Sequence, residues 1–366
     1  MSFGARAFIR LGALDHNLAV IRKAAPNAAI MAVVKANAYG HGLSVVASAL
    51  SGVDSFAVAR PAEAGILRQA GVTQPIVLLS GVHDAEELAL ARDLDCEIVV
   101  HCLSQVELLE ADAGLQTTVW LKFDTGMNRL GFPIGEARSL IARLQDCAAI
   151  RELRLMTHLA NADDQDDPKT DRQLASFASV ASEFQGDISV ANSGGIFGWP
   201  QSVRADYVRD TGRTWVRPGI AMYGISPFPD RNGSDLGLRP VMQFESKLIA
   251  TKCVRRGDRV GYGGTWAAQR DTVLGIVSAG YGDGYTRALQ SGTPVHVNGR
   301  KLVLAGAISM DMAAIDLGPD AGDRVGDAVV LWGDELPVEE IARQAGMSAY
   351  QLVCGVMNRE ASTIVS

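Results

Sequence analysis

The chain has 366 residues, of which 48% are hydrophobic and 20% are charged, and its formal net charge is −7. This composition is typical of a soluble globular protein, and the negative charge gives no reason to expect nucleic acid or an anionic membrane as a partner. No apolar run approaches the roughly 20 residues that a membrane helix needs, and the N-terminus lacks the plan of a signal peptide, so we expect a cytoplasmic protein.

Over the first 230 residues, short apolar runs rich in β-branched residues alternate with amphipathic stretches. The apolar runs are predicted strands at 29–36, 55–60, 75–81, 96–101, 118–126, 153–160, 187–195 and 215–220. The amphipathic stretches are predicted helices at 63–71, 85–95, 105–112, 136–147 and 172–184. Nearly continuous apolar strands indicate a parallel sheet buried on both faces. The alternation predicts an α/β fold, a (β/α)8 TIM-type barrel, with a doubly wound sheet as the alternative.

The composition changes after the last of these strands. Residues 226–240, SPFPDRNGSDLGLRP, are rich in Pro, Gly and Asp and are a predicted linker. Beyond them, strand-like runs follow one another closely with Gly-rich turns, and helices are expected only at 338–346 and near the ASTIVS ending. We therefore expect two domains, a barrel over 1–230 and a mainly β domain over 231–366.

Polar residues stand where the predicted barrel strands end, which is where this fold builds active sites. They are Lys35, Lys122, Arg129, His158, Asn192, Ser193 and Arg217. For Lys35, which follows the apolar run AIMAVV, two interpretations stay open from the pattern alone. Either its amine reaches solvent along an apolar stem, or it is neutral or covalently bonded, as a Schiff-base lysine would be. The five cysteines and six histidines have no metal-ligand spacing, so no metal is expected.

The stretch KANAYGHG (35–42) resembles the attachment motif for pyridoxal 5'-phosphate (PLP) in alanine racemases. Further motifs that resemble this family occur in its order: LKFDTGMNRLGF (121–132), THLANAD (157–163), ANSGG (191–195), RPGIAMYG (217–224), SAGYGDGY (278–285), GAISMDM (306–312) and SAYQL (348–352). The resemblance covers almost the whole chain. It implies a barrel followed by a β domain, PLP as the cofactor, and a head-to-tail homodimer with shared active sites.

The same resemblance implies a role for each matching residue. Lys35 would carry PLP and act as one of two bases, because racemisation removes the α-proton on one face and returns it on the other. Tyr281 would be the second base, contributed to the partner's site. The remaining positions that match the cofactor site are Tyr39, His158, Asn192, Ser193, Arg217, Gly219, Ile220 and Tyr350. Arg129 and Met310 match positions that hold the substrate carboxylate, and Lys122 matches a position that is often carbamylated.

The expected reaction is the interconversion of L-alanine and D-alanine, either to supply D-alanine for cell-wall peptidoglycan or in alanine catabolism. A racemase of serine or of a broad range of amino acids is the first alternative, because pocket size decides the substrate. A PLP-dependent decarboxylase of the same fold is a weaker alternative, since such enzymes pair the pyridine nitrogen with an acid where this chain offers Arg217. A single-domain, non-enzymatic PLP carrier would lack the second domain that holds Tyr281.

Overall fold

The computed structural model describes residues 3–112, 114, 116–204, 212–357, 359 and 361–365. The chain forms two compact units. One consists of Asn17–Ala38 and Leu43–Met222, and the other of the N-terminal segment up to His16, of Tyr39–Gly42 and of the chain from Tyr223 onward. The first unit contains a closed parallel barrel and the second a mainly antiparallel sheet.

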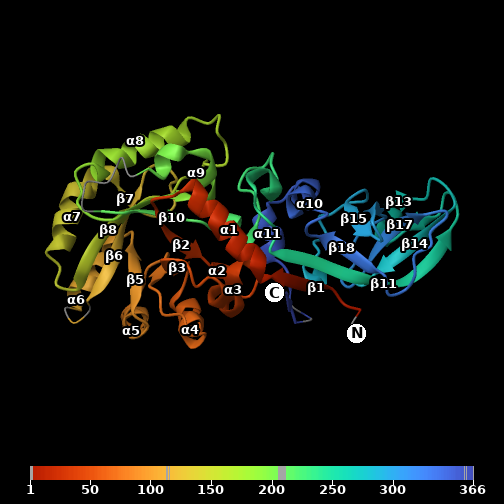
Figure 1. Cartoon of the computed structure of the whole chain (residues 1–366), viewed down its shortest axis with the longest axis horizontal. Coiled ribbons are helices and arrows are strands. Elements are labelled where there is room, and N and C mark those ends of the chain that lie inside the picture. Colours follow the sequence, from red (N-terminus) through yellow and green to blue (C-terminus); the bar gives the residue numbers. More distant parts are fainter. Residues whose placement is uncertain are drawn as a thin grey trace. The chain divides into compact units, whose positions relative to one another are not determined.

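The barrel consists of parallel strands (Figure 1). All of them except Ile150–Met156 are buried along most of their length. They are β2 (Ala29–Val33), β3 (Ser55–Val58), β4 (Ile76–Leu78), β5 (Cys96–Val100), β6 (Thr117–Asp124), β8 (Ile150–Met156), β9 (Ile188–Asn192) and β10 (Thr214–Arg217). They pair in the order β5-β4-β3-β2-β10-β9-β8-β6, and pairing of β5 with β6 closes the ring. A short strand, β7 (Phe132–Pro133), is added to β6. The predicted (β/α)8 barrel is confirmed, and the doubly wound alternative is wrong because the sheet has no open edge.

Helices surround the barrel strands (Figure 1). They are α3 (Leu43–Ala49), α4 (Pro61–Gln69), α5 (Ala85–Asp93), α6 (Leu103–Ala111), α7 (Ala137–Gln145), α8 (Lys169–Ala181) and the short α9 (Ser193–Gly198), while the boundary between the units falls within α1 (Leu11–Ala24). In α7 the buried residues Ala137, Leu140 and Leu144 recur every three or four positions. This spacing gives the helix one apolar face, which packs inward and leaves the opposite face polar.

A charged network fills the barrel interior toward the N-terminal ends of the strands. The Cζ atom of Arg154 lies 5.2 Å from the ring centroids of both Trp120 and Trp215. Its guanidinium pairs with Glu97 at 3.4 Å and Asp187 at 3.5 Å, and these carboxylates accept the indole N–H groups of Trp120 and Trp215, both at 2.6 Å. Burial raises the pKa of Glu97 in spite of Arg154. Residues at this end of such a barrel serve stability.

The second unit is built on one large sheet. Its strands are β1 (Arg6–Arg10), β11 (Met242–Val254), β14 (Thr272–Val277), β15 (Pro294–Val297), β16 (Arg300–Leu304), β17 (Ala313–Gly318), β18 (Ala328–Trp332) and β19 (Thr363–Val365), in the order β14-β17-β16-β15-β18-β11-β1-β19 with β14 also paired to β11. Strands β12 (Arg259–Val260) and β13 (Trp266–Ala267) form a separate pair. Helices α10 (Val338–Ala345) and α11 (Ala349–Cys354) precede the final strand.

The division between the units differs from the single boundary after residue 230 that the sequence predicted. Strand β1 pairs antiparallel with β11, with Arg6 opposite Glu245, so the N-terminal segment belongs to the second unit. Its alternating burial is that of a strand with one covered face, which needs a sheet to pair with. Near the C-terminus the additional helix is α11, whereas Thr363–Val365 of the ASTIVS stretch form strand β19 beside β1.

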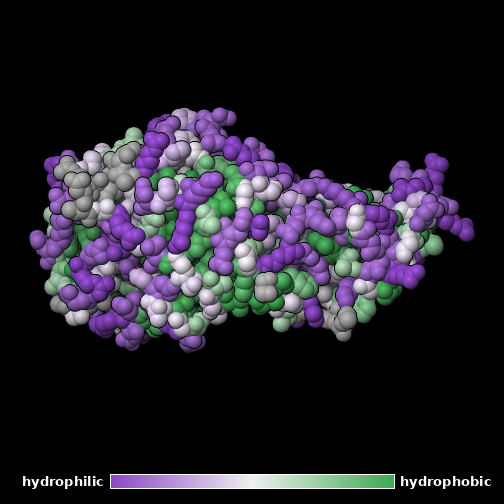
Figure 2. Space-filling view, viewed as in Figure 1, coloured by the Kyte–Doolittle hydropathy of each residue, from purple (hydrophilic) through white to green (hydrophobic). Residues whose placement is uncertain are grey.

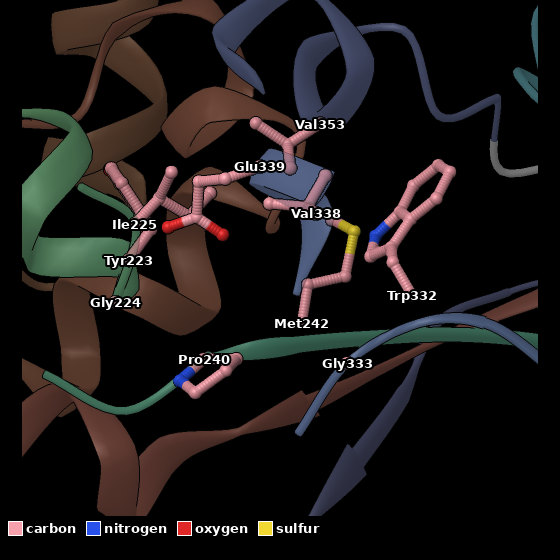
Figure 3. A pocket seen from close by; sticks show the side chains of 10 residues that line it. All are labelled: Tyr223, Gly224, Ile225, Pro240, Met242, Trp332, Gly333, Val338, Glu339 and Val353. Atoms are coloured by element: carbon pink, nitrogen blue, oxygen red, sulfur yellow. The ribbon is translucent and has the colours of Figure 1, made fainter. Parts of the chain in front are cut away.

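A buried carboxylate fastens the segment that leads into the second sheet. One oxygen of Glu339, in α10, accepts the backbone N–H groups of Ser226 at 2.9 Å and Gly233 at 2.8 Å. Glu339 borders a small cavity whose lining includes Trp332 and Met242 (Figure 3). Burial raises the pKa of Glu339. Because no cationic side chain lines this cavity, we assign Glu339 a structural role.

The visible face of the molecule is mainly hydrophilic, with hydrophobic residues in smaller patches (Figure 2). Within the described part of the chain, every helix is too short or too polar to traverse a lipid bilayer.

Candidate active site

Ionisable side chains gather at the C-terminal ends of the barrel strands. Lys35 follows β2, Lys122 lies near the end of β6, His158 follows β8, and Arg217 ends β10. Because the strands are parallel, these ends form one rim of the barrel. The charges interact there, since Lys35, Lys122, Arg129 and Arg217 all lower the pKa of His158.

Lys35 begins a turn with an uncommon backbone. Strand β2 ends at Val33, earlier than the predicted run of 29–36, and Lys35 is half-buried. The element α2 (Lys35–Tyr39) places Ala36, Asn37, Ala38 and Tyr39 in the left-handed region, with φ from 53° to 54°. Left-handed backbone costs about 1–2 kcal/mol per L-residue. Such strain persists only where surrounding contacts hold it, and it clusters at functional sites.

Two side chains hold this turn through hydrogen bonds, Glu63 from outside α2 and Asn37 from within it. Ala36 donates its N–H to Glu63 Oε1 at 2.7 Å, and Leu43 donates its N–H to Asn37 Oδ1 at 2.9 Å. Glu63 lies in the first turn of α4, so the helix after the next barrel strand supports the segment that begins with Lys35. The position of Lys35 is therefore set by the barrel itself.

Arg217 is buried and donates to several groups of the barrel. Its guanidinium donates to Ser189 Oγ at 2.5 Å, to the Thr157 carbonyl at 2.6 Å and to the Val190 carbonyl at 3.2 Å. It also lies 3.3 Å from Nδ1 of His158. A guanidinium only donates, so this nitrogen of His158 accepts and its Nε2 carries the proton. Burial, and after it Arg217, keep the pKa of His158 well below its usual range.

Lys122 is a buried lysine among other cations, and its side chain is only 7% exposed. Burial lowers its pKa to about 7, and Arg217, Arg129 and Lys35 act in the same direction while Asp124 opposes them. Near neutral pH, its amine is therefore uncharged in about half of the molecules. An uncharged amine is the form that reacts with electrophiles.

Asp124 shapes the loop that carries Arg129. Its Oδ1 accepts the backbone N–H groups of Gly126, Met127 and Asn128, at 2.8, 2.9 and 3.1 Å. Burial would raise the pKa of Asp124, but these hydrogen bonds outweigh it and the pKa is lowered. The carboxylate of Asp124 is thus hydrogen-bonded by the backbone of its own loop. The side chain of Arg129 is exposed, so a ligand can reach its guanidinium.

Two loops of the rim are joined through Ser193. Its Oγ accepts the N–H of Gly219 at 3.0 Å and of Ala221 at 3.3 Å, so the loops after β9 and β10 are held together around Ile220. Asn192 caps α9 by accepting the N–H of Gly195 at 2.9 Å. In this fold, the loops after the last two barrel strands frequently form a phosphate-binding site.

In the second unit, Tyr39 and Tyr350 lie together. Their ring centroids are 6.0 Å apart, and Tyr39 is 4.9 Å from Tyr223. Burial raises the pKa of Tyr39. Gly40 permits this arrangement, because it has φ +83° and a Cβ there would come within 2.1 Å of the Val353 carbonyl oxygen. The structure thus brings together two of the residues expected to bind a cofactor phosphate.

Tyr281 and Met310 lie on two segments that are joined by backbone hydrogen bonds. Tyr281 donates its N–H to the Ser309 carbonyl at 3.1 Å, and Gly282 donates to the Met310 carbonyl at 2.8 Å. A Cβ on Gly280 would meet those carbonyl oxygens at 2.2–2.3 Å, so only glycine allows this approach. Both side chains are exposed, Tyr281 at 38% and Met310 at 55%.

The rim residues fit an anionic, phosphate-bearing cofactor such as PLP. Lys35, Arg129 and Arg217 supply positive charge, whereas Asp124 is already engaged by backbone N–H groups. Such an excess of cations suits a phosphate together with the carboxylate of an amino acid. A lysine at the strand end supplies the amine that PLP requires.

Sequence reasoning missed two residues that shape this rim. Gln173 in α8 accepts the N–H of Ala160 at 2.8 Å and donates to the His158 carbonyl at 3.0 Å. His101 follows β5 and its pKa is lowered by burial and, among charged groups, first by Lys122. His101 ends the apolar run CEIVVH, so the rule that singled out Lys35 would also have found it. Gln173 gives no such signal, because its contact depends on tertiary packing.

Comparison with known proteins agrees with this fold. The family described as alanine racemase, N-terminal domain, matches residues 9–227, and that described as alanine racemase, C-terminal domain, matches residues 241–364. The chain is 48% identical to the alanine racemase of Vibrio cholerae over 97% of this chain and 96% of the relative. Its fold is similar to that of biosynthetic alanine racemase from Pseudomonas aeruginosa, with a TM-score of 0.94, 40% identity and full coverage of both chains. It also resembles alanine racemase from Bartonella henselae with covalently bound pyridoxal phosphate, with a TM-score of 0.87 and 29% identity over 99% of each chain.

Proposed function

The chain belongs to the alanine racemase family, and from this premise we propose that it interconverts L-alanine and D-alanine with Lys35 and Tyr281 as its two bases. The observation that carries the proposal is the cationic rim of the barrel, where Lys35 stands with Lys122, Arg129, His158 and Arg217. PLP, when bound, supplies the electron-withdrawing ring that acidifies the α-hydrogen of an amino acid.

The residues of the rim would hold the cofactor in a fixed orientation. Lys35 would hold it covalently, and Arg217 would face its ring nitrogen. A guanidinium donates and cannot accept a proton, so Arg217 favours an unprotonated nitrogen. Proton return to the α-carbon then competes well against side reactions, which suits racemisation. The phosphate would be bound by Tyr39, Ser193, Tyr350 and the backbone amides of Gly219 and Ile220, with Asn192 as a further residue of the cofactor site.

Two proton carriers on opposite faces would complete the reaction. Lys35 would take or return the α-proton on one face, and Tyr281 on the other. We propose that Tyr281 reaches the site of a partner subunit in a head-to-tail homodimer, and that His158, bonded to Arg217, lies beside it there. The domains would then be a PLP-binding barrel and a β domain that completes the partner's site.

Arg129 and Met310 would bind the carboxylate of the amino acid. A guanidinium matches a carboxylate with two parallel hydrogen bonds. We further propose that Lys122 is carbamylated, because its buried amine lies among like charges and a carbamate would reverse its sign and orient Arg129. A density map that shows a bare ammonium on Lys122 would remove this part of the proposal.

The decisive assay is conversion of L- to D-enantiomer by the purified protein with PLP, tested on alanine, serine and lysine. Conversion of alanine well above the other two supports the proposal. Absence of α-hydrogen exchange with every amino acid would refute a racemase. We propose that the enzyme acts in the cytoplasm, either for peptidoglycan or for alanine catabolism. A requirement for D-alanine after deletion of its gene would indicate the peptidoglycan role.

The two bases have a separate test. Tyr281→Phe should slow α-proton removal from one enantiomer more than from the other, because each base serves one face. The solvent-isotope exchange of the two enantiomers measures this directly, and equal small effects would exclude Tyr281. Mixing Lys35→Ala and Tyr281→Phe protomers should restore about a quarter of the sites if each site draws on two subunits.

A further inference from the structure

Lys122 is buried without a partner that would stabilise its charge. It is 7% exposed, and no hydrogen bond or ion pair joins it to any residue that the structure describes. The charged groups around it are Arg217, Arg129 and Lys35, which disfavour an ammonium, and Asp124. A carbamate at this position would gain from the same cations, but its formation from an amine and CO2 releases a proton that must be accepted.

Strand register places one titratable side chain beside Lys122. Val99 is paired with Trp120 and Val100 with Leu121 between β5 and β6. One step further along, His101 is level with Lys122. Side chains at the same level of adjacent strands point to the same face, and Trp120, two residues before Lys122, points into the barrel toward Glu97. His101 and Lys122 therefore share the interior face at the rim.

The hydrogen bonds of His101 define which of its nitrogens is basic. Its Nε2 lies 3.0 Å from the Ser80 carbonyl oxygen, which only accepts, so Nε2 carries the proton. The amide of Gln105 donates to the same carbonyl at 3.2 Å. The Gln105 amide nitrogen also lies 3.1 Å from Nε2, but the Ser80 carbonyl is an acceptor that both groups can donate to. With the proton on Nε2, Nδ1 is the ring nitrogen that can accept a proton. The titratable groups that act on His101 are Lys122, from β6, and the exposed His83, from the loop after β4.

We propose that His101 is the positioning residue for a carbamylated Lys122, taking up the proton released when the carbamate forms and then standing beside it as a cation. This inference rests on the carbamylation included in the proposed function. In the step, the uncharged Nζ of Lys122 attacks the carbon of dissolved CO2 and a C–N bond forms. One C=O electron pair moves onto oxygen, and the proton that leaves Nζ goes to Nδ1 of His101. The products are a carbamate anion and an imidazolium, so the total charge is unchanged.

The pairing explains how one cationic rim can hold a carbamate and still bind a substrate carboxylate. With His101 protonated on one side, the carbamate need not be neutralised by Arg129 alone. Arg129 is then oriented by the carbamate yet keeps a free edge for the substrate. A neutral side chain in place of His101 would remove the one acceptor that the register of β5 and β6 places level with Lys122, and would leave His158 and Asp124 as the other titratable groups that interact with Lys122.

The test is titration of the holoenzyme with 13C-labelled bicarbonate at a fixed pH near neutral, followed by NMR. His101→Gln keeps a donor for the Ser80 carbonyl and removes the basic Nδ1, and His83→Gln is the matched control on the neighbouring loop. The labelled carbamate signal should need on the order of tenfold more bicarbonate in His101→Gln, since the carbamate then loses its charged hydrogen-bonding partner. His83→Gln should behave as the unmodified protein does.

A second measurement follows the protonation of His101 in the unmodified holoenzyme and uses the variant only to assign a resonance. With 15N-labelled histidine, Nδ1 of His101 in the unmodified holoenzyme should become protonated as the carbamate signal grows, with the resonance assigned by its loss in His101→Gln. A carbamate that forms equally well in His101→Gln, or with Nδ1 still unprotonated, overturns the role of His101 while leaving carbamylation intact. A holoenzyme that forms no carbamate overturns carbamylation and this inference together, with the two-base racemase unaffected.

Discussion

Replacing Arg154 by Met should destabilise the protein strongly, although Arg154 lies away from the catalytic rim. The change removes the cation that lies between Trp120 and Trp215 and pairs with Glu97 and Asp187. The side chains of Arg154, Glu97 and Asp187 are 13%, 9% and 12% exposed, so the pairs are largely buried. Removing one partner of a buried ion pair costs about 3–5 kcal/mol, a large part of the roughly 5–15 kcal/mol by which a domain is stable.

The pH dependence follows from the raised pKa of Glu97, whose first cause is burial and which Arg154 now opposes. Without Arg154 this pKa should rise further. A carboxyl whose pKa is higher in the folded than in the unfolded state binds more protons in the native state. The free energy by which the ionised carboxylate destabilises the fold is therefore absent below the unfolded pKa and grows as pH rises to the folded pKa. The loss should therefore be greater at about pH 8 than at about pH 5.

Urea denaturation followed by tryptophan fluorescence measures both effects. Arg138→Met is the control, because the pair of Arg138 with Glu183 is 90% and 65% exposed and should contribute little. Adding Glu97→Gln to Arg154→Met should recover part of the loss, since it removes one unpaired carboxylate. A midpoint equal to that of Arg138→Met, or a loss that grows as pH falls, would refute the reasoning.

Three further predictions concern the site. In CO2-free buffer, Lys122→Met should raise the urea midpoint, because burial lowers the pKa of Lys122 to about 7 and the native state therefore disfavours its charge. The gain in stability should be full below about pH 7 and should shrink as pH approaches the usual lysine pKa. A gain in stability that grows with pH would contradict this reasoning. Ser193→Ala leaves the N–H groups of Gly219 and Ala221 without their acceptor and should cost about 1–3 kcal/mol in urea unfolding, together with weaker PLP binding by absorbance; unchanged PLP binding would argue against a phosphate site there. Gly40→Ala should lower the melting temperature far more than Gly42→Ala, because both have positive φ but only at Gly40 does a Cβ meet the Val353 carbonyl, at 2.1 Å; equal losses would show that φ alone matters.

The barrel was predictable because its strands carry their own signal. Runs such as AIMAVV and CEIVVH are apolar on both faces, and only a sheet covered on both sides buries them. The ionisable residues after these runs indicated the rim for the same reason. The prediction of an α/β barrel with a second, β domain is confirmed, as is membership of the alanine racemase family.

What the sequence did not reveal depends on register or on backbone conformation. The network around Arg154 joins residues from five separate segments, and only the closed barrel brings them to one level. The pairing of β1 with β11 joins residues more than 200 positions apart, which no local pattern reports. His101 ends an apolar run as Lys35 does, but its place level with Lys122 followed only from the register of β5 and β6.

The turn after Lys35 has a consequence for chirality. Ala36 and Ala38 hold φ values of 54° and 53°, the mirror image of right-handed helix, where the Cβ of an L-residue crowds the following carbonyl oxygen. A D-residue has the opposite preference and would adopt this backbone without that crowding. A semisynthetic chain with D-alanine at positions 36 and 38 should therefore be more stable than the natural one. D-alanine, a product of the proposed reaction, thus has the handedness that the backbone after Lys35 favours.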